Sequence, residues 1–318
     1  MPPASPHATR KIVAPGFTGL ITVHDIPLSV ESAGDQGRQL CAQLEAGNIV
    51  MLPQTPIFIP EEDRRLLLGQ KQASSAYRKN IAYHPAEDRV TGFDASEHHE
   101  AERVRRLLRD YSQRSAEFLN RFLPPYAHKC KLDYGSFRPI EEQGRQARLH
   151  SRNDVLHLDS FPTRPTNGAR VLRLFTNINP VQDRVWLTSQ TFETFGPRFA
   201  RAAGLVSLRH NLLKKSVHSI ARAFRLSNVQ RPPYDEFMCR CHNAMKEDVK
   251  FQKTTPKHRW EFPPNSSWLV FTDGVCHAVI SGQYALEQTF LVPQSALVEP
   301  QRSPLAILEK ITGRSLTI

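Results

Sequence analysis

The second half of the chain is a succession of short apolar runs separated by turn-forming residues, and this texture most constrains the fold. Proline, glycine and asparagine between such runs are typical of strands joined by turns. The 24 prolines of the 318-residue chain outnumber its 15 glycines, which favours a loop-rich sheet over a bundle of helices. The expected strands are "KLDYGSFRPIE", "DVLHLDSFP", "ARVLRLFTNINP", "RVWLTS", "SSWLVFTD", "CHAVISG" and "LEQTFLVP".

The part before this region, residues 1–125, is expected to be mainly helical. Apolar residues recur there at the spacing of amphipathic helices, and the last of these helices ends at two prolines. The predicted elements are an irregular lead-in at 1–30, helices at 33–46, 61–70 and 97–122, a strand at 47–53 and a long loop at 71–94.

Helices that precede strands predict an α+β, mainly β fold. The region 126–293 is expected to form an antiparallel barrel or a double-sheet jelly roll, braced by helices on one side. A helical insertion at about 195–252 interrupts it, and a short helix closes the chain in 294–318. Because no linker separates these parts, we predict a single domain over 1–318.

The net charge of +11 indicates anionic partners without naming them. No acidic residue occurs between Glu193 and Asp235, while basic and apolar residues alternate there at roughly helical spacing. This pattern predicts one or two basic amphipathic helices. They are either an ordinary pair of surface helices or a face that meets anionic lipid headgroups or another polyanion.

Cysteine usage and the absence of targeting signals favour a cytoplasmic protein. The five cysteines are an odd number and contain no C-x-x-C pair, which suits a reducing compartment. The first sixteen residues contain no secretory apolar run, and nowhere do 18 apolar residues follow one another.

Chemistry is suggested by the stretch "DVLHLDSFPTRP", in which His157 and Asp159 stand two residues apart. On a strand both side chains point to one face, while Leu156 and Leu158 point to the other. Two ligand-type side chains on one face could hold a metal, although such a triplet alone is a weak signal. The most suitable third ligand is His277, in the strand-like run "TDGVCHAVISG".

Two histidines and one carboxylate would bind one face of an octahedral iron(II) and leave three positions for a cosubstrate and oxygen. Zinc prefers a closed tetrahedral site or a single open position, so this ligand set favours iron.

Three long runs carry a resemblance to a known family. "LHLDSFPTRPTNGARVLRLFTNINP", "YDEFMCRCHNAMKEDVKFQ" and "SSWLVFTDGVCHAVISGQYALEQTFLVP" resemble the Kdo hydroxylases, bacterial iron(II)- and 2-oxoglutarate-dependent dioxygenases. The resemblance covers residues 47–293. It implies a double-stranded β-helix (jelly roll) and the iron ligands His157, Asp159 and His277. It also implies iron(II), 2-oxoglutarate and O2 as reactants, with ascorbate as an optional reductant.

The far carboxylate of 2-oxoglutarate needs a basic anchor, and many dioxygenases place it soon after the late histidine. Here no basic residue lies between His277 and Arg302. We therefore predict that the anchor for this carboxylate lies on the strand that follows His157 and Asp159, which together form the HxD pair. An arginine suits this role because it can bind a carboxylate through two hydrogen bonds. The predicted residues are Arg173, Asn177, Gln288 and Thr289; alternatively Arg173 is a surface residue and Asn177 only shapes a turn.

The predicted substrate-binding residues are Arg152, Arg170 and His150, with Lys246 as a weaker candidate. Arg152 could equally form a loop salt bridge to Asp154. Arg170 lies on the strand face opposite that of Arg173.

The resemblance implies hydroxylation of carbon 3 of Kdo in the lipopolysaccharide inner core or in Kdo-lipid A. The products would be Ko, succinate and CO2. The expected partner is then an anionic Kdo glycolipid, met in the cytoplasm or on the cytoplasmic face of the inner membrane. One alternative is a hydroxylase of the same superfamily that acts on another small molecule or a protein. Another is a non-catalytic basic protein that binds polyanions. No nucleic-acid-binding motif is visible, so nucleic acid is not an expected partner.

Overall fold

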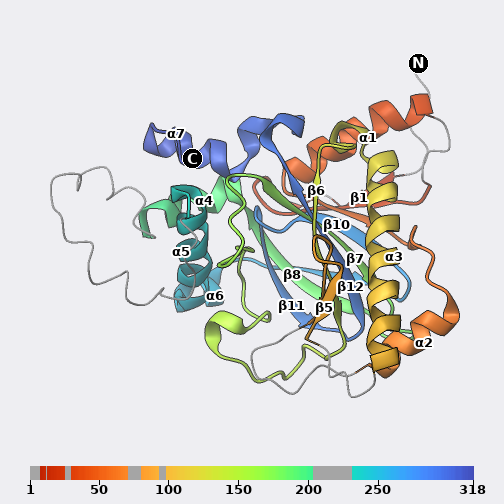
Figure 1. Cartoon of the computed structure of the whole chain (residues 1–318). Coiled ribbons are helices and arrows are strands. Elements are labelled where there is room, and N and C mark those ends of the chain that lie inside the picture. The colour runs from red at the N-terminus through yellow and green to blue at the C-terminus, as the bar shows by residue number, and fades with distance from the viewer. Residues whose placement is uncertain (1–7, 12, 26–29, 71–79, 93–97, 203–230) are drawn as a thin grey trace.

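The computed structural model describes the whole chain except residues 1–7, 12, 26–29, 71–79, 93–97 and 203–230. Two facing β-sheets form the centre, and helices cover the outer side of each sheet (Figure 1). Within the described residues, no helix is long and apolar enough to cross a membrane.

The larger sheet has nine strands and is antiparallel except where β2 pairs with β3. It covers one side of the predicted metal-ligand residues and supplies Arg138 and Arg173, which are described below. In spatial order its strands are β1 (Ala8–Lys11), β2 (Leu20–Val23), β3 (Ile49–Leu52), β10 (Ser267–Phe271), β7 (Arg170–Asn177), β12 (Ala285–Val292), β6 (Lys131–Arg138), β4 (Ile81–His84) and β5 (Arg89–Thr91).

The smaller sheet has the order β11 (Val275–Ser281), β8 (Arg184–Thr191) and β9 (His258–Phe262). The HxD segment runs beside β11 and pairs with it only through the bridge between His157 and His277. The HxD segment therefore lies at the edge of this sheet, next to β11, without forming a regular fourth strand.

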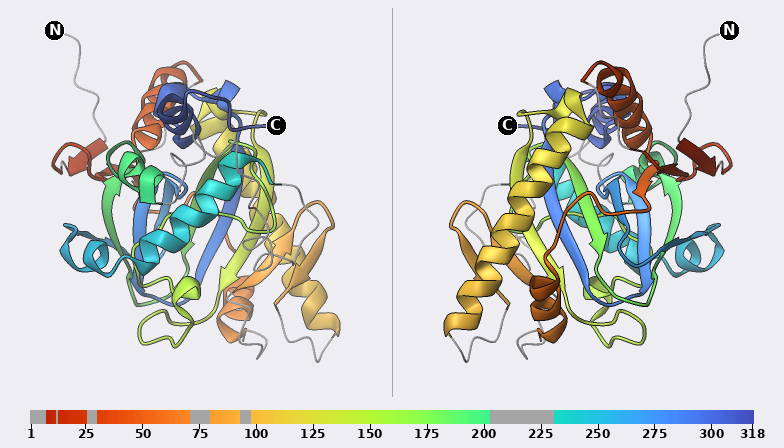
Figure 2. Two further views of the ribbon diagram at one scale, coloured as in Figure 1. Left: turned by 90° about the vertical axis from the view of Figure 1, so that its left-hand side faces the viewer. Right: turned by 90° about the vertical axis from the view of Figure 1, so that its right-hand side faces the viewer.

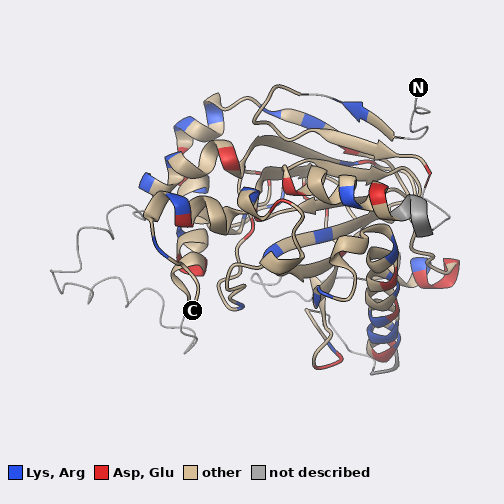
Figure 3. Ribbon diagram, turned by 90° about the horizontal axis from the view of Figure 1, so that it is seen from above, with Lys and Arg blue, Asp and Glu red and all other residues tan. Residues whose placement is uncertain are grey.

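Helices lie on both outer faces, as the turned views also show (Figure 2). Helices α1 (Val30–Glu45), α2 (Glu61–Gly69) and α3 (His98–Phe122) belong to the side of the larger sheet. Along α3, basic and acidic residues are interspersed (Figure 3). On the side of the smaller sheet lie α4 (Phe192–Ala202), α5 (Pro233–Glu247), α6 (Val249–Thr254) and α7 (Pro304–Thr312). Short 3-10 turns occur at Pro124–Tyr126, Leu149–Ser151, Gln294–Ala296 and Pro300–Arg302.

Strand alternation explains this layering. On β7, Leu172 and Leu174 belong to the core under α1 and α3, whereas Phe175 belongs to the core between the sheets. On β11, Cys276 and Ala278 pack with α5, so His277 faces inward. Successive side chains of a strand point to opposite faces, which places alternate residues in different layers.

This architecture confirms the predicted α+β, mainly β jelly-roll class. The helices expected at 33–46, 61–70 and 97–122 are present with small shifts. Much of the predicted basic segment falls in 203–230, outside the described residues. Whether it forms basic helices stays a prediction, as does the single-domain assignment.

Three expectations for secondary structure were wrong. The lead-in contains β1 and β2, and the long loop at 71–94 contains the β4–β5 hairpin. The expected HxD strand is irregular apart from its bridge, because helix side chains take the place of a neighbouring strand, as described below.

Candidate active site

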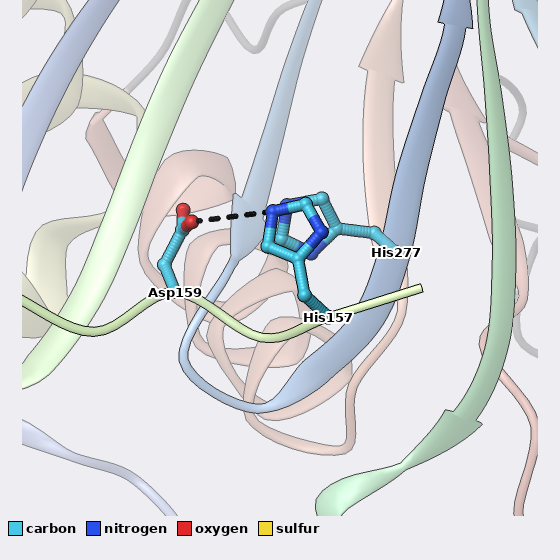
Figure 4. Close-up of side chains that lie close together, drawn as sticks. All are labelled: His157, Asp159 and His277. Carbon is cyan, nitrogen blue, oxygen red and sulfur yellow. Dashed lines mark ion pairs between the residues drawn. The ribbon is translucent and has the colours of Figure 1, made fainter. Parts of the chain in front are cut away.

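The structure brings His157, Asp159 and His277 together between the two sheets, with one ligand-type atom of each within 4.8 Å of the others. Nε2 of His157 lies 3.8 Å from Oδ1 of Asp159, and both imidazoles lie against this carboxylate (Figure 4). The histidines are almost fully buried, each 4% exposed. The geometry matches the predicted facial triad.

Backbone hydrogen bonds fix all three ligands. The His157 N–H donates to the His277 carbonyl at 2.9 Å, and the His277 N–H donates to the His157 carbonyl at 2.8 Å. The Asp159 N–H donates to the carbonyl of Thr272 at 2.8 Å. The HxD segment is thus held in register with β11 at the position of the late histidine.

The imidazoles are oriented by their own neighbours. Nδ1 of His157 donates to the Val155 carbonyl at 2.8 Å, and Nδ1 of His277 donates to the Val275 carbonyl at 2.9 Å. Each Nδ1–H is therefore occupied, and each Nε2 lone pair is available to a metal.

Electrostatics keep His157, Asp159 and His277 in the protonation states that a metal site would require. Burial lowers the pKa of His157 well below its ordinary value and also lowers the pKa of His277. Burial alone would raise the pKa of Asp159, but the Arg173 guanidinium holds this pKa well below its usual range. Two neutral imidazoles and one carboxylate are the protonation states that a metal requires.

Helices α5 and α6 supply the hydrogen bonds that a neighbouring strand would otherwise give to the HxD segment. His242 donates from Nδ1 to the Leu158 carbonyl at 2.6 Å. Nζ of Lys246 donates to the carbonyls of His150 and Arg152 at 3.0 and 2.7 Å. The Gln252 amide accepts from the N–H of Leu156 at 2.9 Å and donates to its carbonyl at 2.8 Å.

Arg173 lies beside Asp159, one of the predicted metal ligands. Its Nη1 is 3.3 Å from Oδ2 of Asp159 and 2.8 Å from Oε1 of Glu287. Glu287 also accepts two hydrogen bonds from Arg138, at 2.9 and 2.6 Å. Although burial opposes its ionisation, Arg138 and Arg173 lower the pKa of Glu287. Arg173 therefore already balances two carboxylates, and its Nε lacks a hydrogen bond to any described residue.

Arg184 is the strongest remaining candidate for an anion anchor. It is fully buried, and only Nη1 is hydrogen-bonded, to the Gly282 carbonyl at 2.8 Å. Among the described residues, its Nε and Nη2 and the indole nitrogen of Trp186 have no hydrogen-bond partner. Trp186 stacks on His277, with ring centroids 5.1 Å apart. Burial and the nearby Arg138 lower the pKa of Arg184 to about 10.

Nη2 of Arg184 forms an ion pair with Oε1 of Glu142 at 3.9 Å, too long for a hydrogen bond, so these donors could still bind a dicarboxylate beside the candidate metal site. Buried donors without acceptors cost free energy, so such a group normally awaits a ligand or water. The site therefore fits 2-oxoglutarate, with one end at the triad and the far carboxylate at Arg184 and Arg138.

The other predicted anchor residues have different surroundings. Thr289 is buried opposite Arg173 on the adjacent strand. The Asn177 amide donates to the carbonyls of Gln182 and Phe262, which agrees with the turn-shaping alternative. Gln288 hydrogen-bonds Ser112 of α3 and therefore lies on the outer face of the sheet. The structure does not bring Gln288 to the metal ligands.

The predicted substrate residues all have protein partners. Arg152 forms a two-point ion pair with Asp154, at 2.9 and 2.6 Å. Arg170 is 1% exposed and pairs with the buried Asp273 at 2.8 Å. His150 lies on the surface, 2.6 Å from Glu247. These contacts give each residue a structural role, and substrate binding by any of them stays a prediction.

Arg138, Arg184 and Trp186 were missed by sequence reasoning. Arg184 and Trp186 share a face of the run "RVWLTS", but the other side of that sheet is also apolar. Alternation therefore could not show which face meets the metal.

A comparison with protein families matches residues 28–315 to 3-deoxy-D-manno-oct-2-ulosonic acid (Kdo) hydroxylase. The chain belongs to the Kdo hydroxylase family. The family expected from the sequence is therefore confirmed. A comparison with curated proteins finds no match for this family member.

Solved structures similar to this family member include the Kdo hydroxylase KdoO, a non-heme Fe(II) alpha-ketoglutarate-dependent dioxygenase. The apo form is 29% identical with a TM-score of 0.79. The complex with alpha-ketoglutarate and Fe(III) is 28% identical with a TM-score of 0.78, and the cobalt(II) complex is 30% identical with a TM-score of 0.79. Each match covers 94% of this chain and 97% of the other.

Proposed function

We propose that this protein hydroxylates carbon 3 of Kdo in the lipopolysaccharide inner core or Kdo-lipid A, giving Ko, succinate and CO2. As a member of the Kdo hydroxylase family, it is an iron(II)- and 2-oxoglutarate-dependent dioxygenase. The observation that carries the proposal is the convergence of His157, Asp159 and His277 beside unpartnered buried arginine nitrogens.

Iron(II) with bound 2-oxoglutarate supplies the oxidative chemistry, in which O2 is consumed. His157, Asp159 and His277 would hold the metal through Nε2, a carboxylate oxygen and Nε2. Arg184 and Arg138 would hold the far carboxylate of 2-oxoglutarate, and the Trp186 indole N–H can donate to the same cosubstrate. Arg173 keeps Asp159 ionised and in place.

The protein also excludes water from the reacting atoms. The histidines and Trp186 are at most 4% exposed, and the core between the sheets packs around them. A dry site strengthens the hydrogen bonds and ion pairs that hold charged reactants.

We place the reaction on the cytoplasmic face of the inner membrane, with contact to an anionic glycolipid. The net charge of +11 supports an anionic partner, because cationic surfaces are attracted to acidic lipid headgroups. Cell fractionation tests this placement, and recovery outside the cytoplasm and inner membrane would contradict it.

An anaerobic titration with iron(II) and 2-oxoglutarate tests the site. The wild-type protein is expected to develop the weak visible charge-transfer band of iron-bound 2-oxoglutarate, and His157→Ala and His277→Ala are expected to lose it. His24→Ala, at an exposed histidine, is the matched control. Absence of the band in the wild type, or its survival in both ligand variants, would contradict the proposed centre.

Mass spectrometry of lipid from cells with and without the protein tests the substrate. The expected result is a gain of one oxygen on Kdo. Turnover of 2-oxoglutarate without any change in Kdo lipid would instead point to another small molecule or a protein as substrate.

A further inference from the structure

We propose that Arg164, flanked by Tyr134 and Phe161, forms a subsite for an anionic group of the sugar substrate. The ligand chemistry is a carboxylate or phosphate attached to a sugar ring. This inference rests on the proposed function and adds the residues that select the substrate.

Arg164 lies in the loop that leaves the metal ligand Asp159. A turn, in which the Arg164 N–H donates to the Phe161 carbonyl at 3.3 Å, folds this loop back on itself. The guanidinium carbon then lies 3.8 Å from the Tyr134 ring centroid and 4.3 Å from the Phe161 ring centroid. Contacts with two aromatic rings orient the planar guanidinium before any ligand arrives.

A β-bulge brings Tyr134 and Asp133 to this guanidinium. On β12, Gln288 pairs with Gly135 and Phe290 pairs with Leu132, so Asp133 and Tyr134 together oppose one residue. A bulge of this kind re-aims side chains and is common beside active sites. Asp133 forms an ion pair with Arg164, and the Tyr134 ring lies 4.0 Å from that of His84 on the next strand.

The subsite is continuous with the metal centre. The Phe161 ring contacts Arg164 on the outside and lies 5.5 Å from the guanidinium carbon of Arg173. Arg173 in turn is 3.3 Å from Asp159. The Phe161 ring therefore lies between Arg164 and Arg173, and Arg173 contacts the predicted metal ligand Asp159.

Arg164 still has hydrogen-bond donors to offer. Its side chain is 28% exposed, whereas those of Arg173 and Arg184 are 10% and 0% exposed. Among the described residues, Asp133 is its only hydrogen-bond acceptor. Because a guanidinium has five N–H donors, a second anion can bind while the pair with Asp133 persists.

Glycolipid binding in the absence of turnover tests the subsite. Kdo-lipid A in detergent micelles would be titrated into the protein loaded with cobalt(II) and 2-oxoglutarate, without oxygen. Arg164→Gln is expected to raise the Kd for the glycolipid about 10- to 100-fold, while the affinities for cobalt and 2-oxoglutarate stay unchanged. Arg259→Gln, which removes an exposed, ion-paired arginine of β9, is the matched control.

Two additional variants keep the test decisive if Arg164→Gln folds poorly. Arg164→Lys retains the charge but not the planar fork, so weaker binding than in the wild type is expected. Tyr134→Leu removes one of the two rings that orient the guanidinium and is therefore also expected to weaken glycolipid binding. A folded set of variants with wild-type Kd values would overturn the subsite.

A comparison of glycolipids identifies the anion. If Arg164→Gln weakens binding of phosphorylated and dephosphorylated Kdo-lipid A equally, Arg164 binds the Kdo carboxylate; if only the phosphorylated lipid is affected, it binds a phosphate. A wild type that binds the lipid without hydroxylating it in air contradicts the proposed reaction but not the subsite. A wild type that binds neither lipid contradicts the subsite.

Discussion

Three imidazoles at the metal centre are held neutral by burial, and this makes stability depend on pH. Burial lowers the pKa values of His157, His277 and His242, the last to about 4, with Lys246 adding to the effect. In the unfolded chain each imidazole takes up a proton near pH 6.5. Stability of the metal-free protein is therefore full above about pH 6.5 and falls as the pH decreases toward 4.

Urea denaturation at pH 7 and pH 5 measures this loss. Between these two pH values, His242 alone is expected to contribute about 2 kcal/mol of the pH dependence. His242→Gln should flatten the dependence, and His24→Gln, at an exposed position, should leave it unchanged. An equally steep dependence in His242→Gln would show that this imidazole does not remain neutral in the folded protein.

Arg184 should control affinity for 2-oxoglutarate rather than for metal. Its Nε and Nη2 lack acceptors, and it does not contact the triad residues in the described structure. Arg184→Met keeps most of the buried volume and removes the donors. We expect the Kd for 2-oxoglutarate to rise at least about 10-fold, measured by the charge-transfer band, with the Kd for cobalt(II) nearly constant.

Arg259→Met is the control for the charge change, because this arginine is exposed on β9. If Arg184→Met binds 2-oxoglutarate normally while Arg173→Met does not, the original prediction of Arg173 as the anchor holds instead.

At the level of single residues, the sequence pointed to candidate metal ligands but not to their surroundings. Strand alternation and the family runs indicated His157, Asp159 and His277, and the structure brings these three side chains together. The arginine cluster could not be found in the same way, because Arg138, Arg173 and Arg184 come from three strands of two sheets. Their convergence depends on how the sheets pack, which no local pattern encodes.

Among the elements, α5 and α6 are what hold the irregular HxD segment in place. Gln252 makes two hydrogen bonds to the backbone of Leu156 and a third to the carbonyl of Met245. Gln252→Ala leaves the buried Leu156 N–H and carbonyl without these partners. We expect a loss of about 1–3 kcal/mol in the free energy of unfolding, measured by urea denaturation.

The same variant should weaken cobalt(II) binding, because Leu156 precedes the first metal ligand. Lys253→Ala, at an exposed position of α6, is the matched control. Unchanged cobalt affinity together with reduced stability would mean that Gln252 supports the fold without positioning the ligand.

Elements with a strong apolar periodicity were predicted well. Elements that are stabilised mainly by contacts with other strands or helices were not. The long helix α3 and the buried strands β7 and β12 carry clear apolar patterns. The short β4–β5 hairpin has charged residues at its turn and is stabilised by pairing with β6 and by burial of Ile81 and Tyr83, so its sequence alone resembles a loop. The HxD run has a strand pattern, yet on one side it contacts helix side chains instead of a strand.

For the whole molecule, bound metal should raise stability because the ligands lie in different parts of the chain. Metal binding to the folded state alone adds free energy, about 2.7 kcal/mol at a free concentration of 100 times Kd. Cobalt(II) is therefore expected to raise the Tm, and EDTA to reverse the rise. A Tm rise of equal size in His277→Ala would contradict binding at the triad.

The bridge between His157 and His277 has a further consequence for the chain as a polymer. His277 lies 118 residues beyond Asp159, and the intervening segment includes most of the smaller sheet and helices α4 to α6. A metal that joins these positions closes this segment into a loop, as a disulfide would, and lowers the entropy of partly unfolded states. Proteases should therefore cut the metal-free protein between the two ligands more readily than the metal-bound protein, even under conditions in which both remain folded.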